Sequence, residues 1–319
     1  MATSALSRSA TCLAAIAALL AGCGAPTAVP QSPAAAPLAK TTSSALLYVS
    51  GNSPSFLSIY AYPTGKLVRV IKNANFSYLR GACVNSNGDV FVTSSNGKIL
   101  EYKRGSPKRL ETLDAPAGQE PFDCSVDPTT GNLAVASLQG PGGAKGSVAI
   151  YAHAQGSPQV YTDPNVHSYY FCAYDNNGNL FVDGLTLGRF RLAELPVGSN
   201  TFVDISLNHP IKFPGSVMWD GEYLAVADQL APKVYEFSVT GSAGTLVHTT
   251  PVDTVTSDRA FWIEGKQLFV ADHSGFGANR ARSYRKVEVF AYPAGGKPVK
   301  VITTNVAHSD GITVSLAPH

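Results

Sequence analysis

The hexapeptide NGNLFV (residues 177–182) joins a tight turn to a short apolar run, and the chain repeats this combination. Asn-Gly, Asp-Gly and similar pairs before alternating β-branched and aromatic residues are strong signals of a β-hairpin. The other copies are NGDVFV (87–92), TGNLAV (130–135), DGEYLAV (220–226) and EGKQLFV (264–270). The chain therefore contains a repeated unit built from strands.

Further strands flank each copy of this turn. One strand precedes the turn, at 82–85, 124–127, 172–175, 217–220 and 261–264. A third strand is expected at 57–63, 98–104, 147–153, 189–195, 233–239 and 286–293, and a less regular fourth at 66–71 and 298–302. Four strands that recur every 40–50 residues or so, about the length of one blade, are typical of a β-propeller.

Counting these units predicts an all-β fold, a six-bladed β-propeller of four-stranded blades. The first unit lacks its leading strand, because Leu46–Ser50 matches the second strand of the other units. We expect Ile312–Ser315 to supply the missing strand, so that the C-terminal strand joins the N-terminal blade and closes the ring. Closure of this kind removes the unpaired sheet edges that promote aggregation.

The unit resembles the NHL repeat and its relatives, which include gluconolactonase-like and peptidyl-amidoglycolate-lyase-like propellers. Their pattern is a strand ending in Asp or Asn, a Gly turn and then Leu-Phe-Val-Ala-Asp, and Val-Ala-Asp at 226–228 and 270–272 matches it best. The resemblance covers most of residues 46–315 and implies the propeller fold, although blades one to three lack the Asp. The gluconolactonase-like relatives hold a metal in the channel, but Ala45 or Leu46 stands here in place of their first-blade Glu.

Residues 1–22 have the features of a signal peptide. Arg8 gives a weakly positive start, and the apolar run Ala10–Leu20 is too short to span a bilayer. The run ends in LLAGC (19–23), which resembles the bacterial lipobox, in which the Cys is lipidated and becomes the mature N-terminus. An ordinary signal peptide with a chance Cys is the alternative. A lipid on Cys23 would anchor the protein to a membrane.

Three segments follow from this reading. Residues 1–22 are the signal, residues 23–44 are the lipidated Cys with a flexible tether rich in Ala, Pro, Ser and Thr, and residues 45–319 are the propeller. We expect the protein to be exported and lipid-anchored to the cell envelope, with the propeller outside the cytoplasm. Gly24 after the Cys favours the outer membrane, by resemblance to the sorting rule of enteric bacteria.

The charge of the chain argues against nucleic acid as a partner. Without residues 1–22, which contain Arg8 and no acidic residue, 23 basic side chains stand against 22 acidic ones. A chain so close to neutral has no long-range attraction for a phosphate backbone.

The cysteines carry no metal-binding spacing. We expect Cys83, Cys124 and Cys172 to be small buried side chains. One disulfide with an odd thiol is the alternative in an oxidising compartment.

The loops that lead into each first strand, and those between second and third strands, gather around the central channel of a propeller. The first group offers these ligand-binding candidates: Arg80, Asp123, His167, Tyr170, Asp258, Arg259, His308 and Asp310. The second group offers Asp183, Asp228, Asp272 and His273. This polar rim could bind a small polar ligand. The alternatives are turn capping by the second-group acids and a surface ion pair between Asp258 and Arg259.

The sequence does not decide whether the channel binds a metal ion. His167 and His308 resemble metal ligands of the lyase relatives in their placement, but two imidazoles fall short of a zinc site. The acidic rim has the oxygen ligands that Ca²⁺ prefers. We therefore assign no cofactor, with Ca²⁺ or Zn²⁺ as the ions that the rim could hold.

Residues 272–286 form the longest loop between a second and a third strand, and long loops often carry binding function. The loop-binding candidates are Phe276, Arg280, Arg282, Tyr284 and Arg285. Arg and Tyr together suit carboxylates, sugar acids or a partner protein. The alternative is a solvated loop without a ligand.

The sequence contains no GxSxG, HExxH or similar catalytic motif, so no catalytic residue is assigned. We expect a lipid-anchored binding or scaffold module of the cell envelope, whose partner is an envelope protein or a small polar ligand. The alternative is a metal-dependent lactonase or lyase with its site in the central channel.

Overall fold

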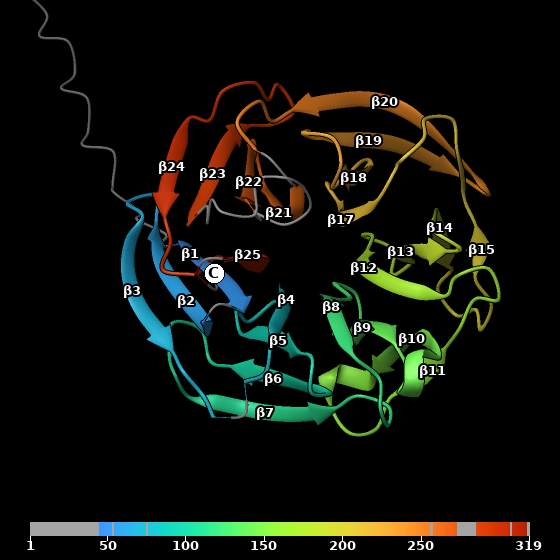
Figure 1. Cartoon of the computed structure of the whole chain (residues 1–319), viewed down its shortest axis with the longest axis horizontal. Coiled ribbons are helices and arrows are strands. Elements are labelled where there is room, and N and C mark those ends of the chain that lie inside the picture. Colours follow the sequence, from blue (N-terminus) through green and yellow to red (C-terminus); the bar gives the residue numbers. More distant parts are fainter. Residues whose placement is uncertain are drawn as a thin grey trace, which may run out of the picture. The chain divides into compact units, whose positions relative to one another are not determined.

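The computed structural model of the chain describes residues 45–52, 54–74, 76–255, 258–272, 285–306 and 308–317, without the side chains of Asp258 and Arg259. The signal, the tether and Cys23 lie outside these residues. Six antiparallel sheets are arranged around a central axis (Figure 1). In the described part of the chain, no helix has the length and apolar character that a membrane span requires.

Each sheet is one blade, and its strands are named here in their order from the central axis to the outer edge. Blades 1 to 3 consist of β25 (Ser309–Ser315), β1 (Ala45–Asn52), β2 (Ser55–Tyr62) and β3 (Lys66–Ile71); β4 (Leu79–Val84), β5 (Val90–Ser94), β6 (Lys98–Tyr102) and β7 (Arg109–Asp114); and β8 (Pro121–Val126), β9 (Leu133–Gln139), β10 (Lys145–Tyr151) and β11 (Gln159–Tyr161).

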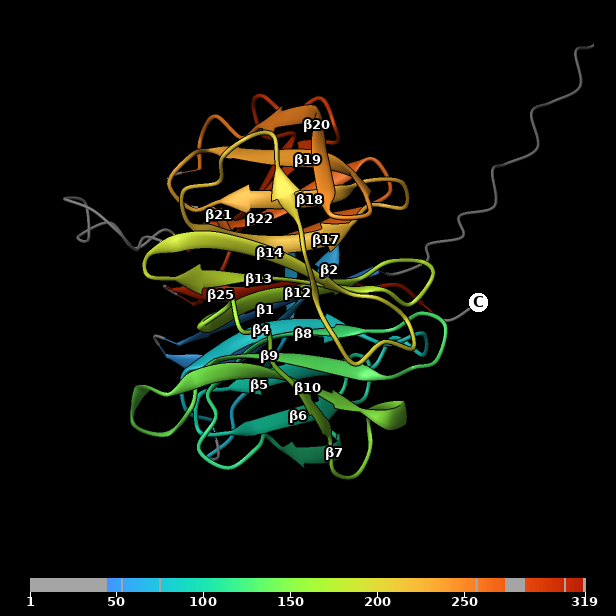
Figure 2. The ribbon, with the colours of Figure 1, turned by 90° about the vertical axis from the view of Figure 1, so that its right-hand side faces the viewer.

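Blades 4 to 6 follow the same order. They consist of β12 (Ser168–Tyr174), β13 (Leu180–Thr186), β14 (Arg189–Leu195) and β15 (Val203–Asp204); β17 (Pro214–Trp219), β18 (Leu224–Asp228), β19 (Lys233–Thr240) and β20 (Ala243–Pro251); and β21 (Asp258–Glu264), β22 (Gln267–Asp272), β23 (Lys286–Ala291) and β24 (Lys300–Thr303). Figure 2 shows the first strands β8, β12 and β17 near the middle of a side view, with β7 and β20 at its two ends.

The C-terminal strand closes the ring, as the sequence predicts. β25 pairs antiparallel with β1, and Val314 lies opposite Leu47 while Ile312 lies opposite Val49. The first strands also contact one another in a complete circle, in the order β25, β4, β8, β12, β17, β21 and back to β25. The six-bladed architecture is therefore confirmed.

The repeated turns form because their residues satisfy the backbone locally. Gly178 adopts a φ of 86°, which a residue without a Cβ reaches at little cost. The carboxylate of Asp175 accepts the backbone N–H groups of Asn177 and Asn179, both at 2.8 Å. Each first strand is thus turned back into its second strand.

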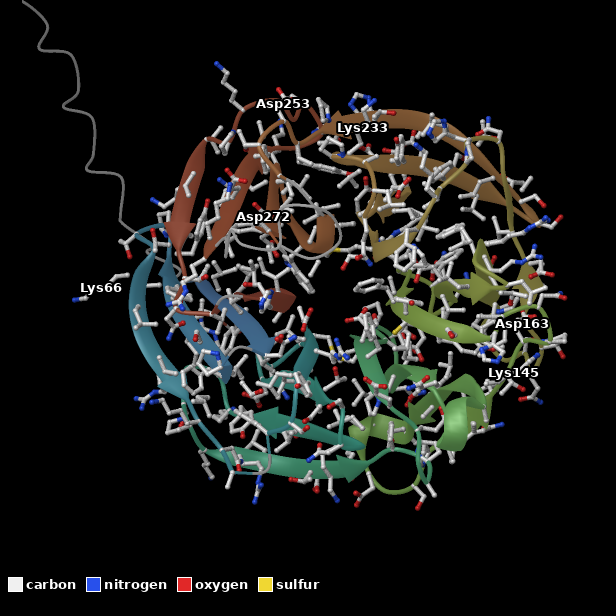
Figure 3. The ribbon with its side chains drawn as sticks, in the orientation of Figure 1. Lys66, Lys145, Asp163, Lys233, Asp253 and Asp272 are labelled. Atoms are coloured by element: carbon white, nitrogen blue, oxygen red, sulfur yellow. A yellow bond between two sulfur atoms is a disulfide. The ribbon has the colours of Figure 1, made fainter. Side chains whose placement is uncertain are left out.

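Apolar side chains fill the spaces between neighbouring blades. Between blades 1 and 2, Tyr48, Ile59, Val90 and Val92 belong to one buried cluster. Each such side chain contributes about 1.5–3 kcal/mol when it is fully buried. Charged side chains mark the outer perimeter instead, where Lys66 points away from the ring in Figure 3.

Two details differ from the expected blades. The first strands begin three or four residues earlier than predicted in blades 2 to 6, and each has a register shift near its start that marks a β-bulge. A bulge interrupts the strict alternation of side chains, so these starts look like loops in the sequence. Blade 5 also gains a fifth strand, β16 (Ser206–Leu207), parallel to β20.

Candidate functional site

The bulges place a set of side chains at one mouth of the central channel. Arg80 in β4, Phe122 in β8, Tyr170 in β12 and Asp310 in β25 each lie where the register skips a residue. Arg80, Tyr170 and Asp310 were predicted to lie in loops, and that placement is wrong because they belong to the bulged strands. A bulge turns a side chain away from its regular direction, which often serves a site.

Arg80 is the centre of this group. Its Nη2 lies 3.0 Å from Oε1 of Glu120, and its Nη1 lies 3.8 Å from Oδ2 of Asp310. The guanidinium also stacks over the ring of Phe122, 5.3 Å from the centroid. Asn52 completes this side by donating to Asp310. The arginine is therefore held in place from blades 1 and 3.

Aromatic rings extend the group across blades 3 to 5. Phe122 packs edge-to-face on Tyr170 with centroids 5.1 Å apart, and Tyr170 packs in the same way on Phe213 at 5.7 Å. Tyr170 and Phe213 are half-buried, so part of each ring faces solvent. We call the following residues the mouth cluster: Asn52, Arg80, Glu120, Phe122, Tyr170, Phe213 and Asp310.

Asp123, another candidate, lies in the wall of the channel and not in a loop. Its Oδ2 accepts the backbone N–H of Cys172 at 3.2 Å, and its side chain occupies the space that a Cβ on Gly81 would need. Burial raises the pKa of Asp123 to about 7, against the lowering effect of the amides of Cys172 and Cys124. Burial also raises the pKa of Asp183, and the nearby negative charge of Asp123 adds to this rise.

The remaining candidates lie in several different places. His167 is exposed and its Nδ1 lies 3.4 Å from Oγ of Ser168, while the backbone carbonyl of His308 accepts from Asn52. Asp258 and Arg259 begin β21, not a loop, and their side chains lie outside what the structure describes. The loop candidates Phe276, Arg280, Arg282 and Tyr284 also lie outside the described residues, as does His273, while Arg285 is exposed beside β23.

The three second-strand acids have different roles, and Asp183 lies within β13 and not after it. Asp228 caps a turn as expected, since its carboxylate accepts the N–H groups of Lys212, Phe213 and Leu230. Asp183 accepts the N–H of Phe171 within β12. Asp272 is fully buried and lies 3.4 Å from Nζ of Lys286, further inside the ring than Lys66 in Figure 3. Asp272 is therefore part of an ion pair and not a simple turn cap.

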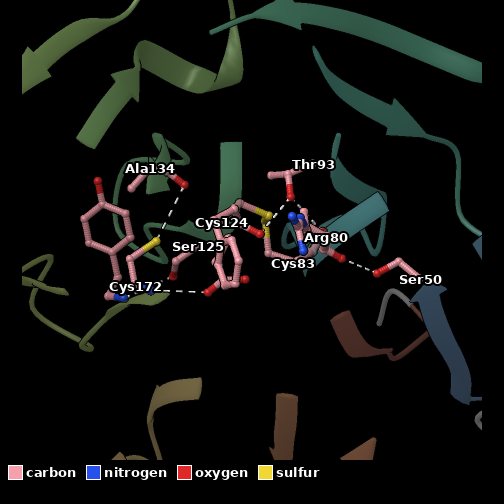
Figure 4. The surroundings of a disulfide bond; sticks show 12 residues. Ser50, Arg80, Cys83, Thr93, Cys124, Ser125, Ala134 and Cys172 are labelled. Atoms are coloured by element: carbon pink, nitrogen blue, oxygen red, sulfur yellow. Dashed lines mark hydrogen bonds between the residues drawn. A yellow bond between two sulfur atoms is a disulfide. The ribbon is translucent and has the colours of Figure 1, made fainter. Parts of the chain in front are cut away.

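Two cysteines are bonded to each other, which corrects the expectation of three buried thiols. Cys83 in β4 and Cys124 in β8 form a disulfide with their Cα atoms 5.7 Å apart (Figure 4). Cys172 is a free, buried thiol directed at the carbonyl of Ala134. The structure thus has the arrangement given as the alternative above, one disulfide and one free thiol. The bridge ties the first strands of blades 2 and 3 together beside the channel.

A cavity of about 180 Å³ lies in the channel and is lined by first strands of all six blades. Asp123 and Asp310 line it, as do the aromatic side chains of Tyr174, Trp219 and Trp262. Among the described residues, no three His, Cys, Asp or Glu side chains are grouped in a way that could hold a metal ion.

Sequence reasoning missed four of the seven residues of the mouth cluster. Phe122 and Phe213 are apolar and were not among the polar candidates, and Glu120 and Asn52 lie outside the strand patterns that were compared. A residue-by-residue alignment of the first strands would have placed Phe122 beside Arg80, since both lie at the bulge.

The fold and this site define the class of protein, a six-bladed β-propeller with a polar and aromatic mouth. A chain from the crystal structure of a nidogen/laminin complex is similar to it, with a TM-score of 0.68, 11% identity and coverage of 86% of this chain and 100% of that one. A protein of unknown function from Bacteroides caccae is similar at a TM-score of 0.65 and 14% identity, covering 85% of this chain and 99% of that one. At such identities the likeness supports the fold alone. No protein-family model and no curated protein matches the chain.

Proposed function

We propose that this chain is an exported, lipid-anchored binding module that holds a protein of the cell envelope at its mouth cluster. The observation that carries the proposal is the arrangement around Arg80, in which a fixed guanidinium, two carboxylates and aromatic rings, among them the half-buried rings of Tyr170 and Phe213, form one contiguous cluster from five blades. Arg and aromatic side chains in such surroundings dominate the energy of protein interfaces.

The rigidity of this surface supports the same role. Arg80 is held by Glu120 and lies on Phe122, so its side chain loses little conformational entropy when a partner binds. Its side chain keeps 18% of its surface exposed, so part of it remains accessible to a partner. The charges nearby are of both signs, and this favours a partner with complementary polar groups over a simple polyanion.

Export and lipid anchoring are supported by the N-terminal sequence and by the disulfide. LLAGC at 19–23 has the lipobox pattern, and disulfides such as Cys83–Cys124 persist mainly in oxidising compartments. The tether of residues 24–44 would let the propeller reach a partner beyond the membrane surface. We infer that the mature protein begins at an acylated Cys23.

The anchor is tested by metabolic labelling with a radioactive fatty acid in a bacterial host. The wild-type chain should incorporate the label and remain with the membranes, and Cys23→Ser should do neither. Label on Cys23→Ser, or none on the wild type in a host that labels its own lipoproteins, would contradict the anchor.

The mouth cluster is tested by affinity capture from solubilised envelopes with quantitative mass spectrometry. We expect a protein that is enriched with the wild type and lost with Arg80→Ala. Arg69→Ala is the matched control, because Arg69 is exposed on the outer strand β3. Equal capture by both variants would show that the mouth cluster is not the contact surface.

A further inference from the structure

The charge of the channel cavity is one-sided. Of the described residues that line it, Asp123 and Asp310 are acidic, and none is a Lys, Arg or His. Asp310 is compensated from outside the cavity by Arg80 and Asn52. Asp123 follows Phe122 of the mouth cluster in β8. In the described part of the chain, no ion pair joins Asp123 to a cation.

The contacts of Asp123 leave its charge without a counter-ion. Its Oδ2 accepts the amide of Cys172, and burial together with the charge of Asp123 raises the pKa of both the Cys172 thiol and the Asp183 carboxyl on the adjoining strands. Asp183 is itself fully buried, and its Oδ2 makes no hydrogen bond to the described residues. A buried carboxylate normally has a paired cation or is protonated.

The opposite end of the cavity is aromatic. Tyr174, Trp219 and Trp262 line the cavity near the ends of β12, β17 and β21, so aromatic residues from three blades border the same space. Trp219 is fixed by stacking on Phe181, with centroids 6.2 Å apart and planes 5° from parallel. Aromatic side chains offer a large apolar area to the apolar part of a ligand.

We propose that this cavity binds one small organic cation, a primary or quaternary ammonium whose nitrogen lies near Asp123 and whose apolar part lies against Tyr174, Trp219 and Trp262. An engineered apolar cavity of about 150 Å³ holds one benzene molecule, so about 180 Å³ suits a cation of roughly ten non-hydrogen atoms or fewer. A hard metal ion would need several more oxygen ligands than two carboxylates provide. This site goes beyond the proposed contact with an envelope protein and does not depend on it.

The pH dependence of binding follows from the raised pKa of Asp123, about 7. Below this value the side chain is neutral and attracts the cation weakly, so affinity should rise as the pH goes from 6 to 8. The charged or titratable groups on the strands around Asp123 are Arg80, Cys172, Asp183 and Asp310.

The test is isothermal titration calorimetry on the purified full chain with choline and 2-phenylethylammonium as probes. Their neutral isosteres, 3,3-dimethylbutan-1-ol and 2-phenylethanol, measure the contribution of the charge. We expect at least one cation to bind at pH 8, at least tenfold more tightly than its isostere and more tightly than at pH 6. Asp123→Asn should lose at least tenfold in affinity, while Asp163→Asn, a buried acid outside the cavity, should bind as the wild type does.

Two results would overturn the proposal. One is the absence of binding by either cation at pH 8 up to millimolar concentration, and the other is equal binding of a cation and its neutral isostere. If Asp123→Asn fails to fold, the pH dependence of the wild type decides alone. Capture of an envelope protein is measured separately, so failure of one proposal leaves the other standing.

Discussion

Removal of the disulfide between Cys83 and Cys124 should destabilise the propeller strongly. The two residues are 41 apart in sequence, and closing a loop of that length removes enough unfolded-state entropy to stabilise the native state by about 4 kcal/mol. For a domain of this size each kcal/mol shifts the melting temperature by about 2–4 °C. The double variant Cys83→Ala/Cys124→Ala should therefore melt roughly 8–16 °C below the wild type.

The control for this variant is Cys172→Ala. Cys172 is buried in the first strand of the next blade and carries a free thiol, so its replacement removes the packing of one sulfur and no cross-link. We expect that loss to cost about 1 kcal/mol. The free energy of unfolding of all three proteins can be measured by guanidinium denaturation without reductant.

The outcome that would refute the reasoning is a double variant within about 1 kcal/mol of Cys172→Ala, on a scale where the cross-link alone is expected to contribute about 4 kcal/mol. Alkylation of the denatured wild type before reduction gives a second check. Peptide mapping should find Cys172 alkylated, and Cys83 and Cys124 alkylated only after reduction.

Three further predictions follow from the strands around the channel. Ser125→Cys should form a second inter-blade disulfide with Cys172. In the strand register, Ser125 and Cys172 in blades 3 and 4 are equivalent to the bonded Cys83 and Cys124 in blades 2 and 3. Non-reducing peptide mapping would detect the new bond. Gly311→Ala should lower the free energy of unfolding by about 3 kcal/mol, because the new Cβ would lie 2.7 Å from a backbone nitrogen of β4. Gly244→Ala should lower it much less, because the closest atom to its Cβ belongs to a flexible side chain. Asp123 has a folded-state pKa of about 7 against its ordinary 3.8, so the folded chain keeps a proton that the unfolded chain loses, and stability should fall as the pH rises from about 4 to 7. Asp123→Asn should make that fall shallower in melts across this pH range, and an unchanged slope would show that the side chain is not desolvated.

The fold could be predicted because its signals are local and repeated. Each hairpin turn satisfies its own backbone, as Asp175 does for Asn177 and Asn179, so the turn has the same sequence pattern in every blade. The closing strand was also predictable, because Leu46–Ser50 matches a second strand and therefore requires a first strand from elsewhere. Topology thus followed from a count of equivalent segments.

The site could be predicted only in part. Arg80, Tyr170 and Asp310 were chosen because polar or aromatic residues precede a strand, and the structure does bring them to one mouth through Phe122. Phe122 and Phe213 carry no polar signal, and an apolar residue beside a strand looks the same in the sequence whether it faces the core or a site. The β-bulges decide this direction, and they have no sequence pattern of their own.

The disulfide illustrates a different limit. Cys124 and Cys172 have equivalent positions in consecutive first strands, whereas Cys83 is one residue out of step with them. That single step turns the side chain of Cys83 toward Cys124, and it is visible only once the strand register is known. Spacing along the chain could not distinguish this pair from three separate thiols.

The most direct test of the proposed function is site-specific photocrosslinking in intact cells. A photoreactive phenylalanine analogue at Tyr170 would report on the mouth cluster, and the same analogue at Val197, which is exposed in the turn between β14 and β15, would report on another surface. We predict a discrete crosslink to an envelope protein from position 170 that Arg80→Ala abolishes, and none to that protein from position 197. A crosslink to the same protein from position 197 alone, or from both positions regardless of Arg80, would contradict the proposal that the mouth cluster is the binding surface.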